Sequence, residues 1–161
     1  MENLEIRRFN NNDATTISKI ICRNFLEVNI KDYSKEEMEL LSEIYNSDKV
    51  LEVASYAHMY VARIDNTIVG SGAISSFWGK LDESILLTIF VLPELQGKGI
   101  GRKIIETLES DEYFLRSKRI EIPASITACE FYKKMKYEYK DGIAELDDEG
   151  HFRLQKFREN I

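Results

Sequence analysis

Residues 91–109 read VLPELQGKGIGRKIIETLE, and the interpretation of the whole chain depends on this stretch. Three glycines, Gly97, Gly99 and Gly101, follow an apolar run, and apolar side chains at helical spacing come directly after them. A helix is therefore expected to begin at the glycines. Backbone N–H groups at a helix start have no partner within the helix, and the helix dipole adds partial positive charge there. The stretch predicts a site for an anion such as phosphate.

The spacing of the glycines excludes two common phosphate-binding motifs. The triphosphate loop needs Gly, four residues, Gly, Lys and then Ser or Thr, but counting from Gly97 places its second glycine at Arg102. The dinucleotide pattern GxGxxG also fails, because it requires glycine at Arg102 or at Ile104. What remains is Gln-x-x-Gly-x-Gly over residues 96–101, for which the plainer alternative is a glycine-rich turn that binds no ligand.

The segments before the glycines predict one strand, two helices and a series of hairpins. Residues 4–8 alternate as in a strand, and the apolar face of residues 14–25 indicates a helix capped by Asn12 or Asp13. A second helix is expected over residues 34–44, where Ser34 begins a capping box, and residues 47–56 could add a helical turn or two. Two strands with a turn at Asp65-Asn66 follow over residues 58–64 and 67–77, and a second turn is expected at residues 78–80.

Residues 83–91, ESILLTIFV, contain almost no polar break and are predicted to form a strand buried on both faces, ended by Pro93. After the glycine helix, residues 118–124 predict a short strand. Thr127 has capping-box spacing for a helix ending near Lys136, and residues 137–142 and 151–157 predict a closing strand pair. The order is therefore β-α-α-β-β-β-α-β-α-β-β. Residues 85–122 should form a right-handed crossover between parallel strands. An α/β fold with a mixed, mostly antiparallel sheet and helices on both faces is expected.

Composition limits the class of protein. The chain has 161 residues, of which 43% are hydrophobic and 31% charged, as expected for one domain with a packed core. A formal net charge of -6 argues against nucleic acid as a partner. No apolar run reaches the ~18 residues of a membrane span, and the start lacks the apolar core of a signal peptide, so a cytoplasmic protein is expected. Cys22 and Cys129 are too few for a metal cluster or a disulfide framework, and His58 and His151 are interpreted as ordinary side chains.

Two segments carry a resemblance to a known family. Residues 89–108, IFVLPELQGKGIGRKIIETL, resemble the signature of the GNAT superfamily of acyl-CoA-dependent N-acyltransferases. Residues 123–139, PASITACEFYKKMKYEY, resemble its second landmark, and the element order is similar to the family's fold. The resemblance implies one N-acetyltransferase domain over residues 1–161, acetyl-CoA as acyl donor and no metal. It also implies a small-molecule or peptide amine as acceptor, no nucleic acid or membrane partner, and a fold that allows a homodimer.

The resemblance also assigns residues to coenzyme A. Backbone N–H groups of six residues would bind its pyrophosphate, in the motif that Gln96 opens: Gly97, Lys98, Gly99, Ile100, Gly101 and Arg102. The end of the apolar strand would pair with the pantetheine arm, through Ile89, Phe90 and Val91. Ser125 would either hydrogen-bond the arm or cap a helix. Lys136 departs from the family, which usually has a left-handed glycine there, so a different helix end is considered.

The implied reaction, direct attack of an amine on the acetyl thioester, sets three chemical tasks. A lysine-like amine with a pKa of ~10.4 costs ~4.6 kcal/mol to deprotonate at pH 7, so a base is useful. Residues 85–91 offer neither Glu nor His, and the candidates are Glu83 and Glu121, acting through water. A backbone N–H near Phe90 or Val91, where the family's strand bulges, would stabilise the oxyanion. Tyr132 would protonate the leaving thiolate, the alternative being a packing role that Phe131 fits better.

A second function remains open at this stage: a module that binds coenzyme A without turnover, as a sensor or scaffold. The lack of a carboxylate in residues 85–91 permits it, while Tyr132 argues against it. The acceptor pocket is expected from residues 21–38 and 142–150. Four side chains there and nearby would favour a cationic amine: Tyr33, Tyr45, Asp147 and Asp148.

Overall fold

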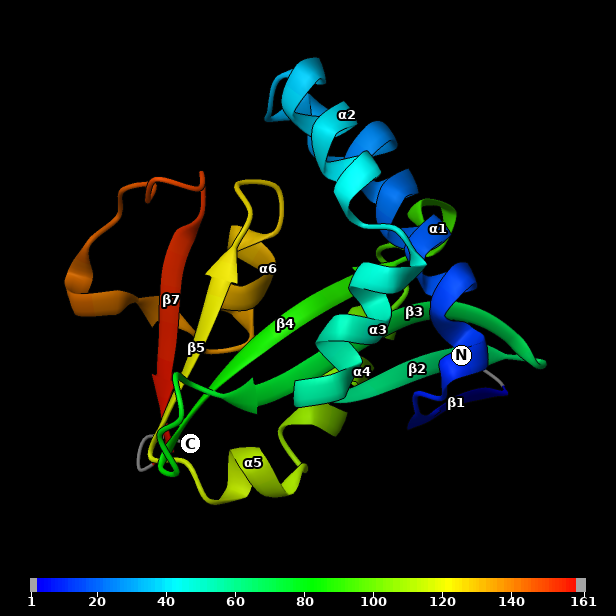
Figure 1. Cartoon of the computed structure of the whole chain (residues 1–161). Coiled ribbons are helices and arrows are strands. Elements are labelled where there is room, and N and C mark those ends of the chain that lie inside the picture. The colour runs from blue at the N-terminus through cyan, green and yellow to red at the C-terminus, as the bar shows by residue number, and fades with distance from the viewer. Residues whose placement is uncertain (1–2, 159–161) are drawn as a thin grey trace.

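The computed structural model describes residues 3–158. One seven-stranded sheet runs through them in the order β1-β2-β3-β4-β5-β7-β6 (Figure 1). The strands are β1 (Leu4–Arg8), β2 (His58–Ile64), β3 (Thr67–Ser76), β4 (Glu83–Val91), β5 (Arg119–Ala124), β6 (Glu138–Tyr139) and β7 (Phe152–Phe157). Neighbouring strands are antiparallel except β4 and β5, which are parallel. The predicted mixed, mostly antiparallel sheet is confirmed.

Helices cover both faces of the sheet, as predicted. They are α1 (Ala14–Glu27), α2 (Lys35–Ile44), α3 (Ser47–Tyr56), α4 (Ile100–Leu108), α5 (Glu112–Leu115) and α6 (Cys129–Lys134). The first three contribute to an apolar core on one face and the last three to a core on the other. The predicted stripe of α4 is fully buried: Ile100, Ile104, Ile105 and Leu108. None of the helices in the described part of the chain is long and apolar enough to cross a membrane.

Several local predictions about helix N-caps and helix lengths were wrong. Asn10, rather than Asn12 or Asp13, accepts the capping hydrogen bond before α1, and its turn forms a capping box with Asp13. The hydroxyl of Thr127 donates to Asp32 instead of capping α6. Helix α3 spans all of residues 47–56, and the sequence did not indicate α5 at all. These differences move helix ends but leave the order of strands unchanged.

Lys136 ends the helical segment in the left-handed conformation, with a φ of +78°. The alternative that a lysine forces a different helix end is therefore wrong. A left-handed backbone costs a non-glycine residue ~1–2 kcal/mol. The N–H of Tyr137 donates to the carbonyl of Tyr132 at 3.2 Å across this turn, and Lys136 itself is exposed. The turn thus tolerates a strained residue because the hydrogen bond and the buried Tyr137 fix its geometry.

Strand β4 is not fully buried on both faces: in its first half Ser84 and Leu86 are buried, whereas Glu83 and Ile85 are partly exposed. It pairs with β5 only through residues 83–85, and the two strands then part (Figure 1). Residues 87–90 are all partly exposed, so the prediction of a strand buried on both faces was wrong, and most clearly for this half. A bulge accompanies the change, because Gly72 of β3 faces both Thr88 and Ile89, and Thr88 has a φ of +50°. Residues 87–90 line a cleft, which accounts for their mostly apolar side chains.

Candidate active site

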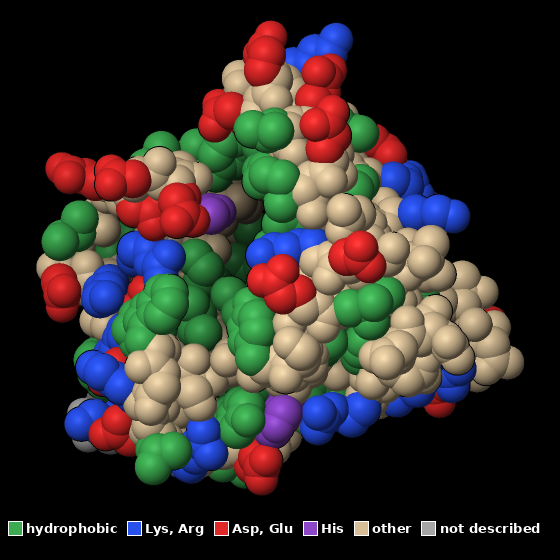
Figure 2. Space-filling model, in the orientation of Figure 1, with side chains coloured by type: hydrophobic (Ala, Val, Ile, Leu, Met, Phe, Trp, Pro, Cys, Tyr) green, Lys and Arg blue, Asp and Glu red, His purple; other side chains and the backbone are tan. Residues whose placement is uncertain are grey.

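A cleft of about 770 Å³ lies where β4 and β5 separate. Figure 2 shows the molecule hollowed between the side that carries α2 and the side that carries β7, with apolar side chains around the hollow. Helices α1–α3, the glycine loop, the start of α4, and α6 complete the walls. Most of the residues assigned from the sequence line it together: Ile89, Phe90, Val91, Gln96, Gly97, Gly99, Ile100, Gly101, Arg102, Ser125 and Tyr132. Lys98, Glu83 and Glu121 are not among the lining residues.

The glycines of the loop have two different structural roles. Gly97 and Gly99 have positive φ values of +78° and +88°, and a Cβ atom at either would meet nothing within 4 Å. Their surroundings are open, as close approach of a ligand to the backbone requires. Gly101 lies inside α4, where a Cβ atom would be 3.2 Å from the ring of Phe131. Gly101 therefore allows α4 and α6 to pack closely, in addition to any role toward a ligand.

The N–H groups of residues 97–102 form a continuous row of unused donors. Among residues 3–158 none of these six N–H groups donates a hydrogen bond, and the first helical bond runs from Lys103 N to Gly99 O at 3.1 Å. Backbone donors in folded proteins are nearly always paired with protein or solvent. A row of them at a helix start, with two open glycines, can bind a diphosphate. Lys98 and Arg102 are exposed beside the row.

The loop is fixed to the body of the protein by two amide side chains. Asn24 of α1 donates to the carbonyl of Val91 at 2.9 Å, and Gln96 donates to Asn24 Oδ1 at 2.8 Å and to the same carbonyl at 3.2 Å. The amide N–H₂ of Gln96 is thus used within the protein, and its structural role is to position the loop. The sequence contained a signal for Asn24, since it continues the apolar face of Ile17 and Ile21 and is buried there. A polar side chain on such a face must find a buried partner.

The bulge of β4 places Thr88 in the wall of the cleft. Ser71 donates its hydroxyl to the carbonyl of Thr88 at 2.8 Å, which stabilises the irregular backbone. The Oγ1 atom of Thr88 is buried and has no hydrogen-bond partner in the described residues. The backbone N–H for an oxyanion was expected near Phe90 or Val91, whereas the irregularity lies at Thr88 and Ile89, slightly earlier in the strand. Thr88 is a cleft residue that the sequence interpretation missed.

Tyr132 lines the cleft and is only 6% exposed. Burial raises the pKa of its phenol well above the usual value of a tyrosine. Within residues 3–158 the hydroxyl makes no hydrogen bond, so it can donate to a ligand in the cleft. Phe131, next to it, packs on Gly101 and therefore has the packing role that the sequence assigned to it.

The two candidate bases lie in an ion-pair cluster away from the cleft. Arg119 contacts Glu83 at 2.9 Å and Glu121 at 2.8 Å. Glu121 is 0% exposed and also accepts from Arg153 at 2.7 Å and contacts Lys140 at 3.1 Å. Burial would raise the pKa of Glu121, but the hydrogen bonds from these three cations lower it below its usual value. A carboxylate held in this way is a poor proton acceptor, and the structure does not bring either glutamate to the cleft.

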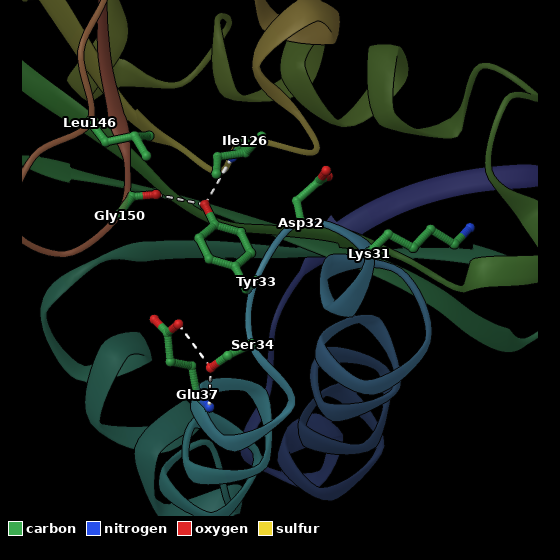
Figure 3. Close-up of a pocket in the computed structure, with 8 residues that line it drawn as sticks. All are labelled: Lys31, Asp32, Tyr33, Ser34, Glu37, Ile126, Leu146 and Gly150. Carbon is green, nitrogen blue, oxygen red and sulfur yellow. Dashed lines mark hydrogen bonds between the residues drawn. The ribbon is translucent and has the colours of Figure 1, made fainter.

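The far end of the cleft is formed by α2, α3 and the turn before β7. Tyr45, Lys49, Tyr56, Glu149 and His151 line it. Of the side chains expected to favour a cationic acceptor, Tyr45 lies in this wall, and Asp148 is not among the lining residues. The carboxylate of Asp147 accepts hydrogen bonds from the N–H groups of Glu149 and His151 at 2.9 Å each. It therefore stabilises the turn in which it lies. Tyr33 lines the cleft, but its hydroxyl is used to join two loops, as Figure 3 shows.

Comparison with known proteins decides the family. Residues 55–139, more than half of the chain, match the acetyltransferase (GNAT) domain. The chain belongs to the GNAT acetyltransferase family. This assignment confirms the resemblance noted in the two motif segments.

Several solved structures share the fold of this GNAT chain. A GCN5-related N-acetyltransferase from Rhodopseudomonas palustris has a TM-score of 0.80 at 20% identity, over 98% of this chain and 97% of that one. PaiA N-acetyltransferase from Thermoplasma acidophilum, solved in complex with coenzyme A, has a TM-score of 0.79 at 19% identity, over 96% and 98%. Ard1 from Thermoplasma volcanium has a TM-score of 0.66 at 16% identity, over 96% and 97%. No curated protein sequence matches the chain.

The described residues of this GNAT domain contain no cluster of metal-ligating side chains. No group of three or more His, Cys, Asp or Glu side chains in residues 3–158 is arranged to hold a metal ion. The cleft is lined by hydroxyl, imidazole, amide and apolar side chains, by backbone donors, and by four charged side chains: Glu37, Lys49, Arg102 and Glu149. At the glycine end, the backbone donors and Arg102 suit an anionic group, and the apolar side chains of β4 suit a partly apolar arm.

Proposed function

We propose that this GNAT domain transfers an acetyl group from acetyl-CoA to an amine by direct attack of the amine on the thioester. The observation that carries the proposal is the row of six N–H groups, residues 97–102, without acceptors at one end of the cleft. The negatively charged oxygens of the coenzyme A diphosphate would accept hydrogen bonds from these N–H groups. Exposed Lys98 and Arg102 would add positive charge beside it.

The arm of the cosubstrate would lie along the free edge of β4. Among the described residues this edge of β4 pairs with no strand beyond Ile85, and Ile89 and Phe90 line the cleft there, so their backbone could pair with an amide-bearing chain. The carbonyl of Val91 already accepts hydrogen bonds from Asn24 and Gln96. Val91 could therefore pair with the arm only through its other backbone atoms. Ser125 accepts from the N–H of Ala128 at 3.1 Å, and its hydroxyl hydrogen is still able to donate to the arm.

Acetyl-CoA supplies an activated thioester, and the residues of the chain supply orientation and proton transfer. The buried phenol of Tyr132 stays protonated over the physiological pH range because burial raises its pKa, so it can donate to the departing sulfur. The unpartnered hydroxyl of Thr88 and the irregular backbone beside it would stabilise charge on the acetyl oxygen. The apolar wall formed by β4 and α6 excludes water and strengthens both interactions.

Tyr132→Phe should lower turnover by about 10- to 100-fold, which is below or at the low edge of the ~10²–10⁴ usual for a general acid. The effect is modest because a thiol of pKa ~8.5 is a tolerable leaving group even without an acid. Coenzyme A affinity should stay nearly unchanged. Steady-state rates and calorimetry on the folded variant measure both quantities.

Tyr137→Phe is the matched control, since it removes a buried phenolic hydroxyl that bonds Glu109 at 2.8 Å and does not line the cleft. Its turnover per folded molecule should equal that of the wild type. Full activity in Tyr132→Phe would reduce Tyr132 to a packing residue and leave the acid unassigned.

The experiment that tests the function is thiol release from acetyl-CoA across a panel of amines, peptides and aminoglycosides. Release that depends on the acceptor supports the proposal and identifies the acceptor class. The second candidate, a coenzyme A-binding sensor or scaffold, is favoured by one observation, the placement of Glu83 and Glu121 in ion pairs outside the cleft. Binding of coenzyme A without thiol release for any acceptor would select that candidate and exclude transfer.

A further inference from the structure

One side chain of the cleft carries a proton-accepting group that nothing in the fold uses. The Nδ1 atom of His151 is buried and has no hydrogen-bond partner among the described residues. His151 lines the cleft together with Tyr132 and Ser125. A buried polar atom without a partner is uncommon in folded proteins and calls for a ligand, a water molecule or a chemical role.

The backbone holds His151 rigidly in this position. Its N–H donates to the carboxylate of Asp147 at 2.9 Å, and its carbonyl accepts from the N–H of Asp147 at 2.8 Å. Tyr33 fixes the preceding residue, because its hydroxyl donates to the carbonyl of Gly150 at 2.6 Å and accepts from the N–H of Ile126 at 2.9 Å (Figure 3). The next residue, Phe152, begins β7 and pairs with Ala124 of β5. The imidazole is thus presented to the cleft from a turn tied to α1–α2 and to β5.

The surroundings of His151 keep its imidazole neutral. Burial lowers its pKa, the nearby charges of Asp147 and Glu149 oppose that shift, and Arg153 adds to it. The net direction is below the ordinary value for histidine, so the ring is uncharged at pH 7. Four titratable side chains from α2, its C-cap and α3 line the same cleft: Glu37, Tyr45, Lys49 and Tyr56.

We propose that His151 is the base that takes the proton from the acceptor amine, an inference that rests on the proposed function. His151 lines the cleft in which the acceptor would lie, and because Nδ1 is buried its Nε2 atom is the nitrogen that would take the proton, whereas Glu83 and Glu121 are held by cations outside the cleft. Neutral imidazole removes one proton from the ammonium, and the freed lone pair forms the N–C bond to the acetyl carbon while the C–S bond breaks. The thiolate takes the phenolic proton of Tyr132, the second amine proton returns to the phenolate, and the imidazolium later gives its proton to water.

His151→Gln tests the assignment, since the amide approximates the shape of imidazole and cannot act as a base near pH 7. Turnover at pH 7 should fall about 10²- to 10⁴-fold, the usual contribution of a general base. In the wild type, kcat/KM should rise with pH along an acid limb set by the pKa of His151, below that of an ordinary histidine. The variant should lose this limb and gain activity steadily up to the pKa of the amine. Calorimetry should show unchanged coenzyme A affinity, because the glycine loop is untouched.

His58→Gln is the matched control, because it removes the other histidine, which pairs with Asp111 at 3.0 Å and does not line the cleft. Its pH profile should coincide with that of the wild type. If His151→Gln keeps the wild-type acid limb, or full turnover in the folded protein, His151 is not the base although the proposed function stands. If wild-type protein releases no thiol with any amine, the proposed function fails, and the assignment of His151 is overturned with it.

Discussion

Glu121→Gln should lower the free energy of unfolding by about 3 kcal/mol, the low end of the ~3–5 kcal/mol lost when one partner of a buried ion pair is removed. Glu121 is fully buried and compensates Arg119, Arg153 and Lys140. The low end is expected because Arg119 keeps its contact with Glu83, and Lys140 can turn toward solvent. Urea unfolding at pH 7 gives the number.

The pH dependence follows from the direction of the pKa shift. The folded-state pKa of Glu121 is lowered, so its stabilisation is complete above the pKa of the unfolded chain, ~4.3 for a glutamate, and is lost as the pH falls through the lower folded-state value. The difference between wild type and Glu121→Gln should therefore narrow below about pH 4.

Glu83→Gln is the control variant, because it removes the other carboxylate that contacts Arg119. This carboxylate is partly exposed, so about 1 kcal/mol or less is expected. Turnover per folded molecule should be unchanged in both variants. A folded Glu121→Gln protein with a large loss of turnover would restore Glu121 as the base and contradict its structural role.

Gly99→Val should weaken coenzyme A binding by about 100-fold, which corresponds to ~2.7 kcal/mol, or one or two charge-assisted hydrogen bonds. Gly99 has a φ of +88° and its Cβ position is open, so the valine side chain would project where the ligand approaches. It would also strain the left-handed backbone and displace the N–H groups of the row. Isothermal calorimetry on the folded variant measures the affinity.

Gly79→Val controls for backbone strain alone. Gly79 in the β3–β4 turn also has a positive φ, +77°, and an open Cβ position, but it does not line the cleft. Its coenzyme A affinity should match the wild type at a similar cost in stability. Gly101→Val is a less suitable test, because its side chain would press on the ring of Phe131. Equal affinities in Gly99→Val and Gly79→Val would place the diphosphate elsewhere.

The order of strands and helices could be predicted from local patterns alone. Hairpin turns at Asp65-Asn66 and Trp78-Gly79 have backbone conformations that short sequences specify, and the α4 stripe follows from helical spacing. The glycine spacing likewise restricted the ligand class before any fold was known. These features depend on residues close together in the sequence, where propensity and periodicity apply.

Features that depend on distant parts of the chain could not be predicted in the same way. The burial of Glu121 among three cations needs β5, β7 and the segment after β6 to meet, and the orphaned nitrogen of His151 needs Tyr33 to fix the turn before β7. The partial exposure of residues 87–90 follows from the parting of β4 and β5, which an apolar run does not reveal. Sequence patterns indicated which residue types the site needs. The topology determines which residues of each type lie at the site.

The most direct test of the central claim, that residues 97–102 bind the diphosphate of coenzyme A, is thermal unfolding with coenzyme A, ATP or NAD at equal millimolar concentrations. Coenzyme A at ~100 times its dissociation constant should add ~2.7 kcal/mol of stability. At ~2–4 °C per kcal/mol for a chain of this size, the melting temperature should rise by about 5–10 °C. ATP and NAD, which lack the pantetheine arm, should give little or no rise. No shift with coenzyme A, or an equal shift with ATP, would contradict the account.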